Sequence, residues 1–416
     1  MTHSGQGAWL KSVDHAVCKI AKWLLGVIDS MQSTPDTGPL GSTTYERSRT
    51  HSYGNGDAVT ATQQVQPDQG AIEAATMQMV GYLTGAALTA GVILGNQLAF
   101  YRHLADSGSL TAQALAERAG TNERITREWL DSQAAGKILS YNATDDTYAL
   151  DDASAMVFAN EDSPVFLADG IGPIRAVFMD VEHIEHATRG DGAFAWSDHH
   201  ECLFAGTGRF FRPGYLNHLT SEWIPSIDGL ADMLTAGAHV LDVGCGVGYS
   251  SVLIAEAFPT TTVTGVDYHA GSIELASENA RNSTAADRVS FDIADAASYH
   301  GTFDLIFFFD CLHDLGDPVG AAQHARHHLA DDGIVMLVEL WALDGRAANI
   351  DAPFAPLFYS ASTFLCTTNS LSQKTGRALG AQSGEAQMRA VFQEAGFTTF
   401  HRTTETPFNN VYAARP

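Results

Sequence analysis

The residues best suited to ligand chemistry lie at the ends of short apolar runs. The first run, Val240–Val243, stops at a turn with glycines at 244, 246 and 248, and Asp242 lies two residues before the first glycine. Glycine accepts positive φ angles and lets a ligand approach bare backbone. The alternating spacing is not the G-x-G-x-x-G pattern of dinucleotide turns. The turn therefore predicts a ligand site of a different kind.

A second acid follows the next apolar run. Asp267 ends Thr262–Val266 and lies roughly 20 residues past the glycines, where ribose-binding acids occur in related folds. The string D-x-G-x-G-x-G at 242–248 resembles motif I of class I methyltransferases, which use S-adenosylmethionine. The resemblance implies a methionine-binding turn, a ribose acid and adenine contacts after Val289–Ile293. The implied cofactor-binding residues are Asp242, Gly244, Cys245, Gly246, Gly248, Asp267, Tyr268, Asp295, Ala296 and Asp310.

A histidine follows the apolar run Phe303–Phe309. The segment Asp310-Cys-Leu-His-Asp-Leu-Gly-Asp-Pro318 resembles a segment of plant and bacterial O-methyltransferases in which the histidine deprotonates the acceptor hydroxyl. By that resemblance His313 maps onto the base, although Leu315 replaces the usual Trp. Histidine suits proton transfer near neutral pH, and Asp314 or Glu339 could fix its tautomer. The alternative is that His313 only hydrogen-bonds the cofactor or the backbone.

The elements that must position these residues alternate between strands and helices. Such alternation predicts an open α/β sheet whose ligands bind at the carboxyl ends of its strands. We expect a Rossmann-like, seven-stranded class I methyltransferase sheet preceded by an α-helical, winged-helix domain. The expected strands are Val240–Val243, Thr262–Val266, Val289–Ile293, Phe303–Phe309, Ile334–Glu339, Phe397–Arg402 and Val411–Ala414.

The stretch Leu110–Leu150 predicts a winged helix. Thr111 is a suitable N-cap and Gly120 a suitable helix end, and a second helix runs from Thr121 to Ala135 before a small hairpin. The cations of this stretch are balanced by acids, whereas DNA binding requires an excess of cations. Many small-molecule O-methyltransferases carry a similar domain, which forms a dimer. The resemblance therefore implies a homodimer and makes nucleic acid an unfavourable partner.

The composition limits partners and compartment. The chain has 416 residues and 48 acids against 23 Lys plus Arg, a net charge of −25. This charge repels nucleic acids and anionic membranes. The five cysteines are widely spaced and form no C-x-x-C pair, which favours a reducing compartment, the cytoplasm. The spacing of His183, His186, His199 and His200 is a weak metal signal, so we expect surface or interface histidines and no metal.

The N-terminal region carries less information. Trp9–Met31 has the pattern of an amphipathic helix, and 32–70 is polar enough to form a flexible linker. Leu83–Phe100, within the helical stretch Ile72–Leu104, is nearly long enough to span a bilayer. Polar residues and glycines dilute it, however. We expect a buried or subunit-interface helix and no transmembrane segment.

These patterns divide the chain into four parts. They are an extension with a linker (1–70), a winged-helix and dimerisation domain (71–160), a helical connector that walls the acceptor pocket (161–232) and a cofactor-binding domain (233–416). The insertion Trp341–Gln382 is aromatic and rich in hydroxyl groups, which predicts a lid or acceptor wall.

Taken together, the resemblance implies an S-adenosylmethionine-dependent methyltransferase acting on a small, hydroxylated organic acceptor and releasing S-adenosylhomocysteine. Methylation of nitrogen or carbon would use the same cofactor site, and the sequence leaves that choice open. The alternative from another class is a cofactor-sensing winged-helix transcriptional regulator.

Overall fold

The computed structural model describes residues 68–416, which divide at residue 90 into two compact units. The predicted helix Trp9–Met31, most of the predicted linker and Cys18 lie outside the described residues. Helix α2 (Gln69–Gln97) begins at the last two residues of that predicted linker.

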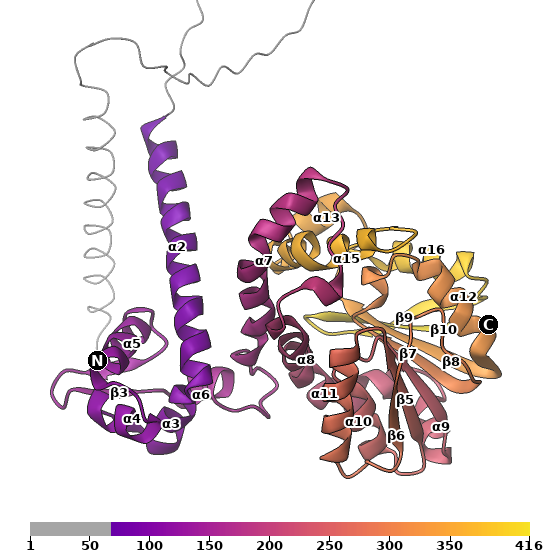
Figure 1. Ribbon diagram of the computed structural model, residues 1–416, viewed down its shortest axis with the longest axis horizontal. Helices are drawn as coiled ribbons and strands as arrows, with labels where there is room; N and C mark the ends of the chain where they lie inside the picture. The colour runs from indigo at the N-terminus through magenta and orange to yellow at the C-terminus, as the bar shows by residue number, and fades with distance from the viewer. Residues whose placement is uncertain (1–67) are drawn as a thin grey trace, which may run out of the picture. The chain divides into compact units, whose positions relative to one another are not determined.

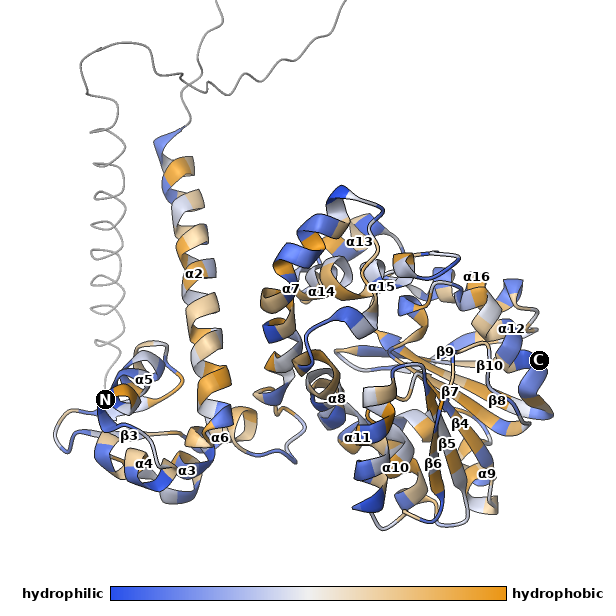
Figure 2. Ribbon diagram, in the orientation of Figure 1, coloured by the Kyte–Doolittle hydropathy of each residue, from blue (hydrophilic) through white to orange (hydrophobic). Residues whose placement is uncertain are grey.

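Helix α2 has few buried residues, and its predicted alternative, a subunit-interface helix, stays a prediction. Only Val92 and Gly95 are buried, while Met79, Tyr82 and Leu83 are more than half exposed. Figure 2 shows hydrophobic residues along much of its length. By length and composition alone α2 could cross a membrane, with a mean hydropathy of 1.5 in its most apolar window. Its apolar surface therefore finds little cover within the described chain.

The predicted winged helix is present. Helices α3 (Phe100–Ser107), α4 (Ala112–Ala119) and α5 (Glu123–Ala135) precede the hairpin β2 (Ser140–Asn142) and β3 (Thr147–Ala149). Strand β1 (Ser109–Leu110) completes a small antiparallel sheet, and α6 (Asp152–Phe158) follows. As predicted, Thr111 caps α4 and Gly120 ends it in the left-handed region. The core contains Phe100, Tyr101, Leu104, Leu115, Trp129, Leu130 and Tyr148.

A helical connector leads to the large sheet. Its main helices are α7 (Gly172–Arg189), α8 (Cys202–Gly214), η3 (Tyr215–Trp223) and α9 (Leu230–Ala236). Short turns η1 (Asp169–Ile171), η2 (Trp196–Asp198) and η4 (Ile224–Ser226) lie between them.

Seven strands form the large sheet, as predicted, in the order β6-β5-β4-β7-β8-β10-β9 (Figure 1). They are β4 (His239–Val243), β5 (Thr262–Asp267), β6 (Val289–Ile293), β7 (Phe303–Phe309), β8 (Leu329–Leu340), β9 (Thr399–Glu405) and β10 (Asn409–Arg415). Only β10 runs antiparallel to its neighbours. Strands β8 and β10 are longer than predicted, and β9 is shifted toward the C-terminus.

Helices cover both faces of this sheet. They are α10 (Tyr249–Ala257), α11 (Ala270–Arg281), α12 (Pro318–His328) and α16 (Glu385–Glu394), with the insertion helices α13 (Arg346–Ile350), α14 (Ala355–Ala361), η6 (Ser362–Cys366) and α15 (Thr367–Ser372). Alternate strand residues point to opposite faces. Leu241 and Phe308 accordingly belong to one buried cluster, and Val240 and Phe307 to the other.

The topology fixes where a ligand can bind. The chain runs outward through β4, β5 and β6, then crosses back to place β7 beside β4. The carboxyl ends of parallel strands on either side of such a reversal form a crevice. The glycine turn after β4 and the His313 segment after β7 lie at this reversal.

Candidate active site

The glycine turn after β4 presents bare backbone to the cavity. Gly244 and Gly246 both have positive φ angles, 71° and 52°. The amide of Gly244 donates to the carbonyl oxygen of Val266 at 2.8 Å, which fixes the turn against β5. A Cβ atom on Gly244 would lie 2.9 Å from Cys311, whereas one on Gly246 would meet nothing within 4 Å. The turn therefore leaves open space beside Gly246.

Asp242 lies beneath the turn and does not line the cavity. Its fully buried carboxylate accepts hydrogen bonds from Ser250 Oγ at 2.7 Å and Ser251 Oγ at 2.6 Å. Burial raises the pKa of Asp242 to about 6, against the opposing effect of these two hydroxyls. Gly248 is also away from the cavity, because it packs against Phe291. Both residues therefore shape the turn from behind.

Asp267 and Tyr268 reach the cavity from the tip of β5. Asp267 Oδ2 accepts from the amide of Gly246 at 3.0 Å, and Oδ1 accepts from the amide of His269 at 2.8 Å. Burial raises the pKa of Asp267, while the two backbone donors oppose this effect. Each carboxylate oxygen has a further lone pair for a ligand. Asp295 and Ala296 line the same cavity beyond β6.

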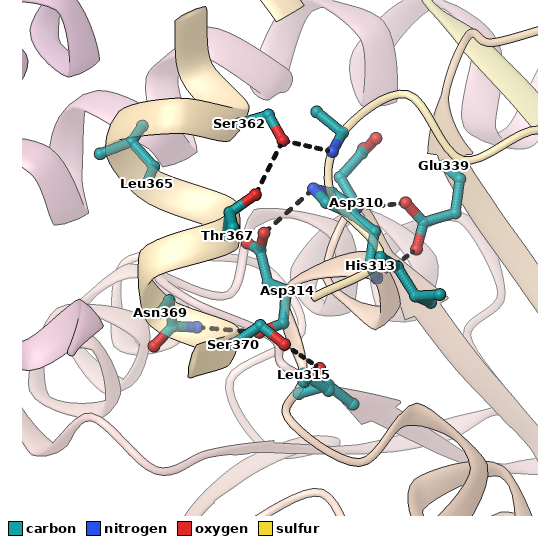
Figure 3. Close-up of polar contacts among 12 residues, drawn as sticks. Asp310, His313, Asp314, Leu315, Glu339, Ser362, Leu365, Thr367, Asn369 and Ser370 are labelled. Carbon is teal, nitrogen blue, oxygen red and sulfur yellow. Dashed lines mark hydrogen bonds and ion pairs between the residues drawn. The ribbon is translucent and has the colours of Figure 1, made fainter. Parts of the chain in front are cut away.

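His313 lies in the turn η5 (Leu312–Asp314) between two carboxylates (Figure 3). Its Nδ1 makes a short contact with Glu339, and its Nε2 lies 3.1 Å from Asp314 Oδ1. Burial alone would lower the pKa of His313, but the attraction of Asp314 and Glu339 outweighs burial and holds the pKa well above its usual value. Both carboxylates named as tautomer partners from the sequence therefore contact the ring.

Asp310 lines the cavity at the end of β7, in the left-handed region with φ of 52°. Its carboxylate accepts from Asn409 Nδ2 at 2.8 Å and from the Tyr215 hydroxyl at 3.4 Å. Burial raises the pKa of Asp310 well above its usual value. Both donors come from distant parts of the chain, so the sequence pattern gave no signal for them.

One cavity of about 680 Å³ joins all the site residues predicted from the sequence except Asp242 and Gly248. Its volume lies in the usual range for small-molecule sites. The connector and the insertion supply apolar walls that include Trp196, Phe204, Phe210, Phe211, Phe354, Phe358 and Phe408. None of the described residues that line it is Lys or Arg. The cavity therefore suits an apolar or cationic ligand, and offers no Lys or Arg to pair with a phosphate.

Three cysteines line the cavity. Cys245 and Cys366 are buried, and Cys311 Sγ donates to the carbonyl oxygen of Val243 at 3.1 Å. Potential ligand atoms of His313, Asp314 and Cys366 lie within 4.8 Å of one another. Burial raises the pKa of Cys366 to about 12, which keeps its side chain a neutral thiol beside the His313–Asp314 ion pair.

The prediction that His199 is a surface or interface residue is wrong for this subunit. Its side chain is buried, and Nδ1 lies 2.8 Å from Asp180, which is also buried on α7. His183 is exposed as expected. The sequence did not reveal the pair because Asp180 and His199 are 19 residues apart.

Within the predicted lid or acceptor wall, polar residues on and just after α15 hold the segment after His313, which the sequence did not indicate. Ser370 Oγ donates to the carbonyl oxygen of Leu315 at 2.8 Å, and Gln373 Oε1 accepts from the amide of Gly316 at 2.7 Å. Asn369 Nδ2 donates to the carbonyl oxygen of Asp314 at 3.2 Å. These residues follow no recognisable spacing, so only the fold brings them to the site.

Comparisons with known proteins agree with this fold. A methyltransferase domain model matches residues 234–396, and an Rv2258c-like winged HTH domain model matches 86–160. The chain is 32% identical over 115 residues to 27-O-demethylrifamycin SV methyltransferase of Amycolatopsis mediterranei, covering 26% of this chain and 42% of that protein. It is 31% identical over 145 residues to a ubiquinone biosynthesis O-methyltransferase of Psychrobacter cryohalolentis, covering 32% and 56%. The chain thus spans about half the length of these relatives.

Solved structures match over a greater length. Human N-acetylserotonin methyltransferase in complex with S-adenosylmethionine superposes with a TM-score of 0.62 at 16% identity, covering 86% of this chain and 99% of that one. Mitomycin 7-O-methyltransferase gives 0.58 at 20% identity, covering 84% and 100%. At these identities the likeness establishes the fold, which is the class I methyltransferase fold with an N-terminal winged helix.

Proposed function

We propose that this chain, which carries a methyltransferase domain in the class I fold, moves a methyl group from S-adenosylmethionine to a hydroxyl group of a small apolar acceptor. The observation that carries the proposal is a single cavity. It combines the bare glycine turn, Asp267 and the buried His313 pair, and contains no lysine or arginine among the described lining residues.

The lining residues fit S-adenosylmethionine. We assign the backbone of Gly244, Cys245 and Gly246 to its methionine end, Asp267 and Tyr268 to its ribose, and Asp295 with Ala296 to its adenine, while Asp242 and Gly248 support the turn. Open space at Gly246 and free lone pairs on Asp267 support this assignment. The cavity acids suit a cationic cofactor better than an anionic dinucleotide. When bound, the cofactor supplies an already activated methyl group. Asp310 adds a further acidic side chain to the wall of the cavity.

The acceptor we propose is uncharged, apolar and hydroxylated. The aromatic walls of the connector and the insertion favour a flat or apolar acceptor, and they exclude water around the reacting groups. An anionic acceptor would meet Asp310 and Asp314 without a compensating Lys or Arg from the described lining. Holding the acceptor oxygen in line with the methyl group supplies much of the rate enhancement.

We assign His313 the role of general base. The contact between Nδ1 and Glu339 orients the imidazole ring so that Nε2 faces Asp314 on the cavity side. The raised pKa means that His313 holds a proton more tightly than a free imidazole does. The ring must therefore lose its Nε2 proton before it can accept the proton of the acceptor hydroxyl. Asp314, which pairs with that nitrogen, controls how readily this occurs.

The pH dependence of turnover tests this role through Asp314→Asn. A base works only when neutral, so kcat should rise with pH through the raised pKa of His313. Removing the Asp314 charge removes one of two carboxylates that stabilise the imidazolium, and so lowers that pKa. The acid limb of the kcat profile should move to lower pH, while Asp292→Asn, an exposed carboxylate outside the cavity, should leave it in place. Superimposable profiles for Asp314→Asn and the wild type would contradict the base role.

The proposed function itself is tested by binding and turnover. Calorimetry with S-adenosylmethionine and S-adenosylhomocysteine should show binding to the purified chain. Native mass spectrometry of that chain identifies any co-purified acceptor, and product mass with fragmentation then tells oxygen from nitrogen or carbon methylation. A chain that binds neither nucleoside refutes the proposal.

The regulator alternative is not favoured. Arg124 pairs with Glu128, and Arg127 pairs with Glu123 and Asp146, so the winged helix presents balanced charges. DNA binding requires cations in excess. Tight, sequence-selective binding of genomic fragments at low salt would reverse this ranking.

We also propose a homodimer and a cytoplasmic location. Helix α2 has exposed apolar residues and leads directly into the winged helix. We therefore favour its pairing with a second copy of the chain rather than its insertion into a bilayer. The last turns of α2 already pack in the winged-helix core, where Gly95 lies against Trp129. The free cysteines of the described residues suit a reducing compartment. Light scattering on the purified chain measures the oligomeric state directly.

A further inference from the structure

One buried side chain, Asn369 on α15, connects three segments that are far apart in the sequence. Its Oδ1 accepts from the backbone amide of Trp196 at 3.0 Å and from the Tyr268 hydroxyl at 3.3 Å. Its Nδ2 donates to the carbonyl oxygen of Asp314 at 3.2 Å (Figure 3). The side chain is only 4% exposed, so these bonds form where losing a partner is costly.

The three partners belong to three parts of the proposed site. Trp196 walls the cavity from the segment 190–201, which joins α7 to α8. Tyr268 follows the ribose acid Asp267, and Asp314 follows the base His313. Asn369 therefore touches the acceptor wall, the cofactor edge and the catalytic turn at once, although it carries out no chemistry itself.

The platform that carries Asn369 is firmly placed. Ser370 and Gln373 fix α15 to the segment after His313, and the carbonyl oxygen of Thr368 accepts from the amide of Phe194 at 3.1 Å. The far end of the segment 190–201 is held by the buried His199–Asp180 pair. Between these two anchors, the amide of Trp196 depends on Asn369.

The contact to Tyr268 is the adjustable one. Its hydroxyl bond is the longest of the three, and Tyr268 is 42% exposed beside the cavity. Burial raises the pKa of Tyr268, so the hydroxyl stays protonated and donates. A ligand held by Asp267 would pack against this ring and restrict it. A restricted Tyr268 ring would keep its hydroxyl on Asn369 Oδ1 and so hold the Asn369 side chain in the orientation that also accepts from the Trp196 amide.

We propose that Asn369 is a positioning residue that couples occupation of the cofactor site to the ordering of Trp196 in the wall of the acceptor cavity. The inference rests on the proposed function, because the nucleoside must bind beside Asp267. Coupling between two sites in one protein typically changes affinity by about 5–150-fold. An acceptor would then find a formed wall mainly after the cofactor has bound.

Hydrogen exchange on the full chain tests the coupling with S-adenosylhomocysteine as the probe. The amide of Trp196 is itself the donor to Asn369, so peptides covering 190–201 report on the bond directly. In the wild type, saturating S-adenosylhomocysteine should slow exchange of this amide by about 5-fold or more. Calorimetry on the same samples measures binding separately.

Three variants isolate the link. Tyr268→Phe removes only the hydroxyl, so it should keep the basal protection of Trp196 and lose the ligand-induced increase. Asn369→Ala should lose both the basal protection of Trp196 and its ligand-induced increase. Asn369→Asp keeps an oxygen that accepts from Trp196 and Tyr268, so it should show the ligand-induced increase. Ser370→Ala is the matched control: it removes the hydrogen bonds of Ser370 Oγ with Leu315 and Ala378 from the same helix, without touching Trp196 or Tyr268. Its basal protection can fall, but it should keep the ligand-induced increase of the wild type.

The outcomes separate this inference from the proposed function. S-adenosylhomocysteine that binds without protecting Trp196 overturns the coupling and leaves the proposed function standing. Equal ligand-induced protection in Tyr268→Phe and wild type also overturns it, as does a loss of the ligand-induced increase in Ser370→Ala as large as that in Asn369→Ala. An absence of binding to the wild type removes the proposed function and the inference together.

Discussion

Replacement of Asp267 by alanine is expected to weaken binding of S-adenosylmethionine by about 10²–10⁴-fold. A hydrogen bond to a charged group contributes roughly 1.5–3 kcal/mol, so a carboxylate that accepts two ribose hydroxyls contributes about twice that, or two to four decades of affinity. The same carboxylate holds the amides of Gly246 and His269, so its loss also loosens the glycine turn. Calorimetric titration with S-adenosylmethionine measures the effect.

Two further variants make this result interpretable. Asp267→Asn keeps one carbonyl acceptor and nearly the same volume, so it should lie between the wild type and the alanine variant. Asp292→Ala removes an exposed carboxylate on the neighbouring strand β6 that does not line the cavity, and should bind normally. Unchanged affinity in Asp267→Ala would refute the ribose assignment.

Replacement of His313 by alanine is expected to lower kcat by about 10²–10⁴-fold, the usual contribution of a general base. Affinity for S-adenosylmethionine should stay nearly unchanged, because the assigned cofactor contacts lie on the turns after β4, β5 and β6. The measurement is a comparison of kcat with the dissociation constant of the nucleoside, made with the acceptor found by mass spectrometry.

Stability must be followed in the same variant. Removing the imidazole leaves Glu339 and Asp314 facing one another in a buried place, and breaking a buried ion pair commonly costs about 3–5 kcal/mol. A thermal melt shows whether the folded fraction has changed. His103→Ala, a half-buried histidine of the winged-helix domain outside the cavity, serves as the matched histidine control. Normal turnover in folded His313→Ala would remove the base role and leave His313 as a structural residue.

Local sequence was sufficient for the elements that carry the site. The run Val240–Val243, the alternating glycines and the apolar stretch behind them encode a strand, a turn with positive φ and a helix within a few residues of one another. Asp267 and His313 could be placed at strand ends for the same reason, since strand direction and length are visible in the apolar pattern. The caps of α4 followed from the residue types at Thr111 and Gly120.

Apolar content alone left open whether α2 is buried within one chain or at a subunit interface. The composition of α2 shows that exposing its apolar surface to water is unfavourable, but it does not show which surface covers the helix. In the described chain the helix stays largely exposed. For His199 the structure shows a buried side chain where an exposed one was expected, because the ring pairs with the buried Asp180 of α7.

The sequence by itself determined the order of strands and turns, and therefore which acids and which histidine gather at one edge of the sheet, because that information is local and periodic. Only the tertiary structure decided what those groups become. It turned Asp242 away from the cavity toward Ser250 and Ser251, placed Glu339 against His313, and set Asn369 between three distant segments. Protonation and positioning depend on neighbours in space, and the chain supplies those neighbours only after it folds.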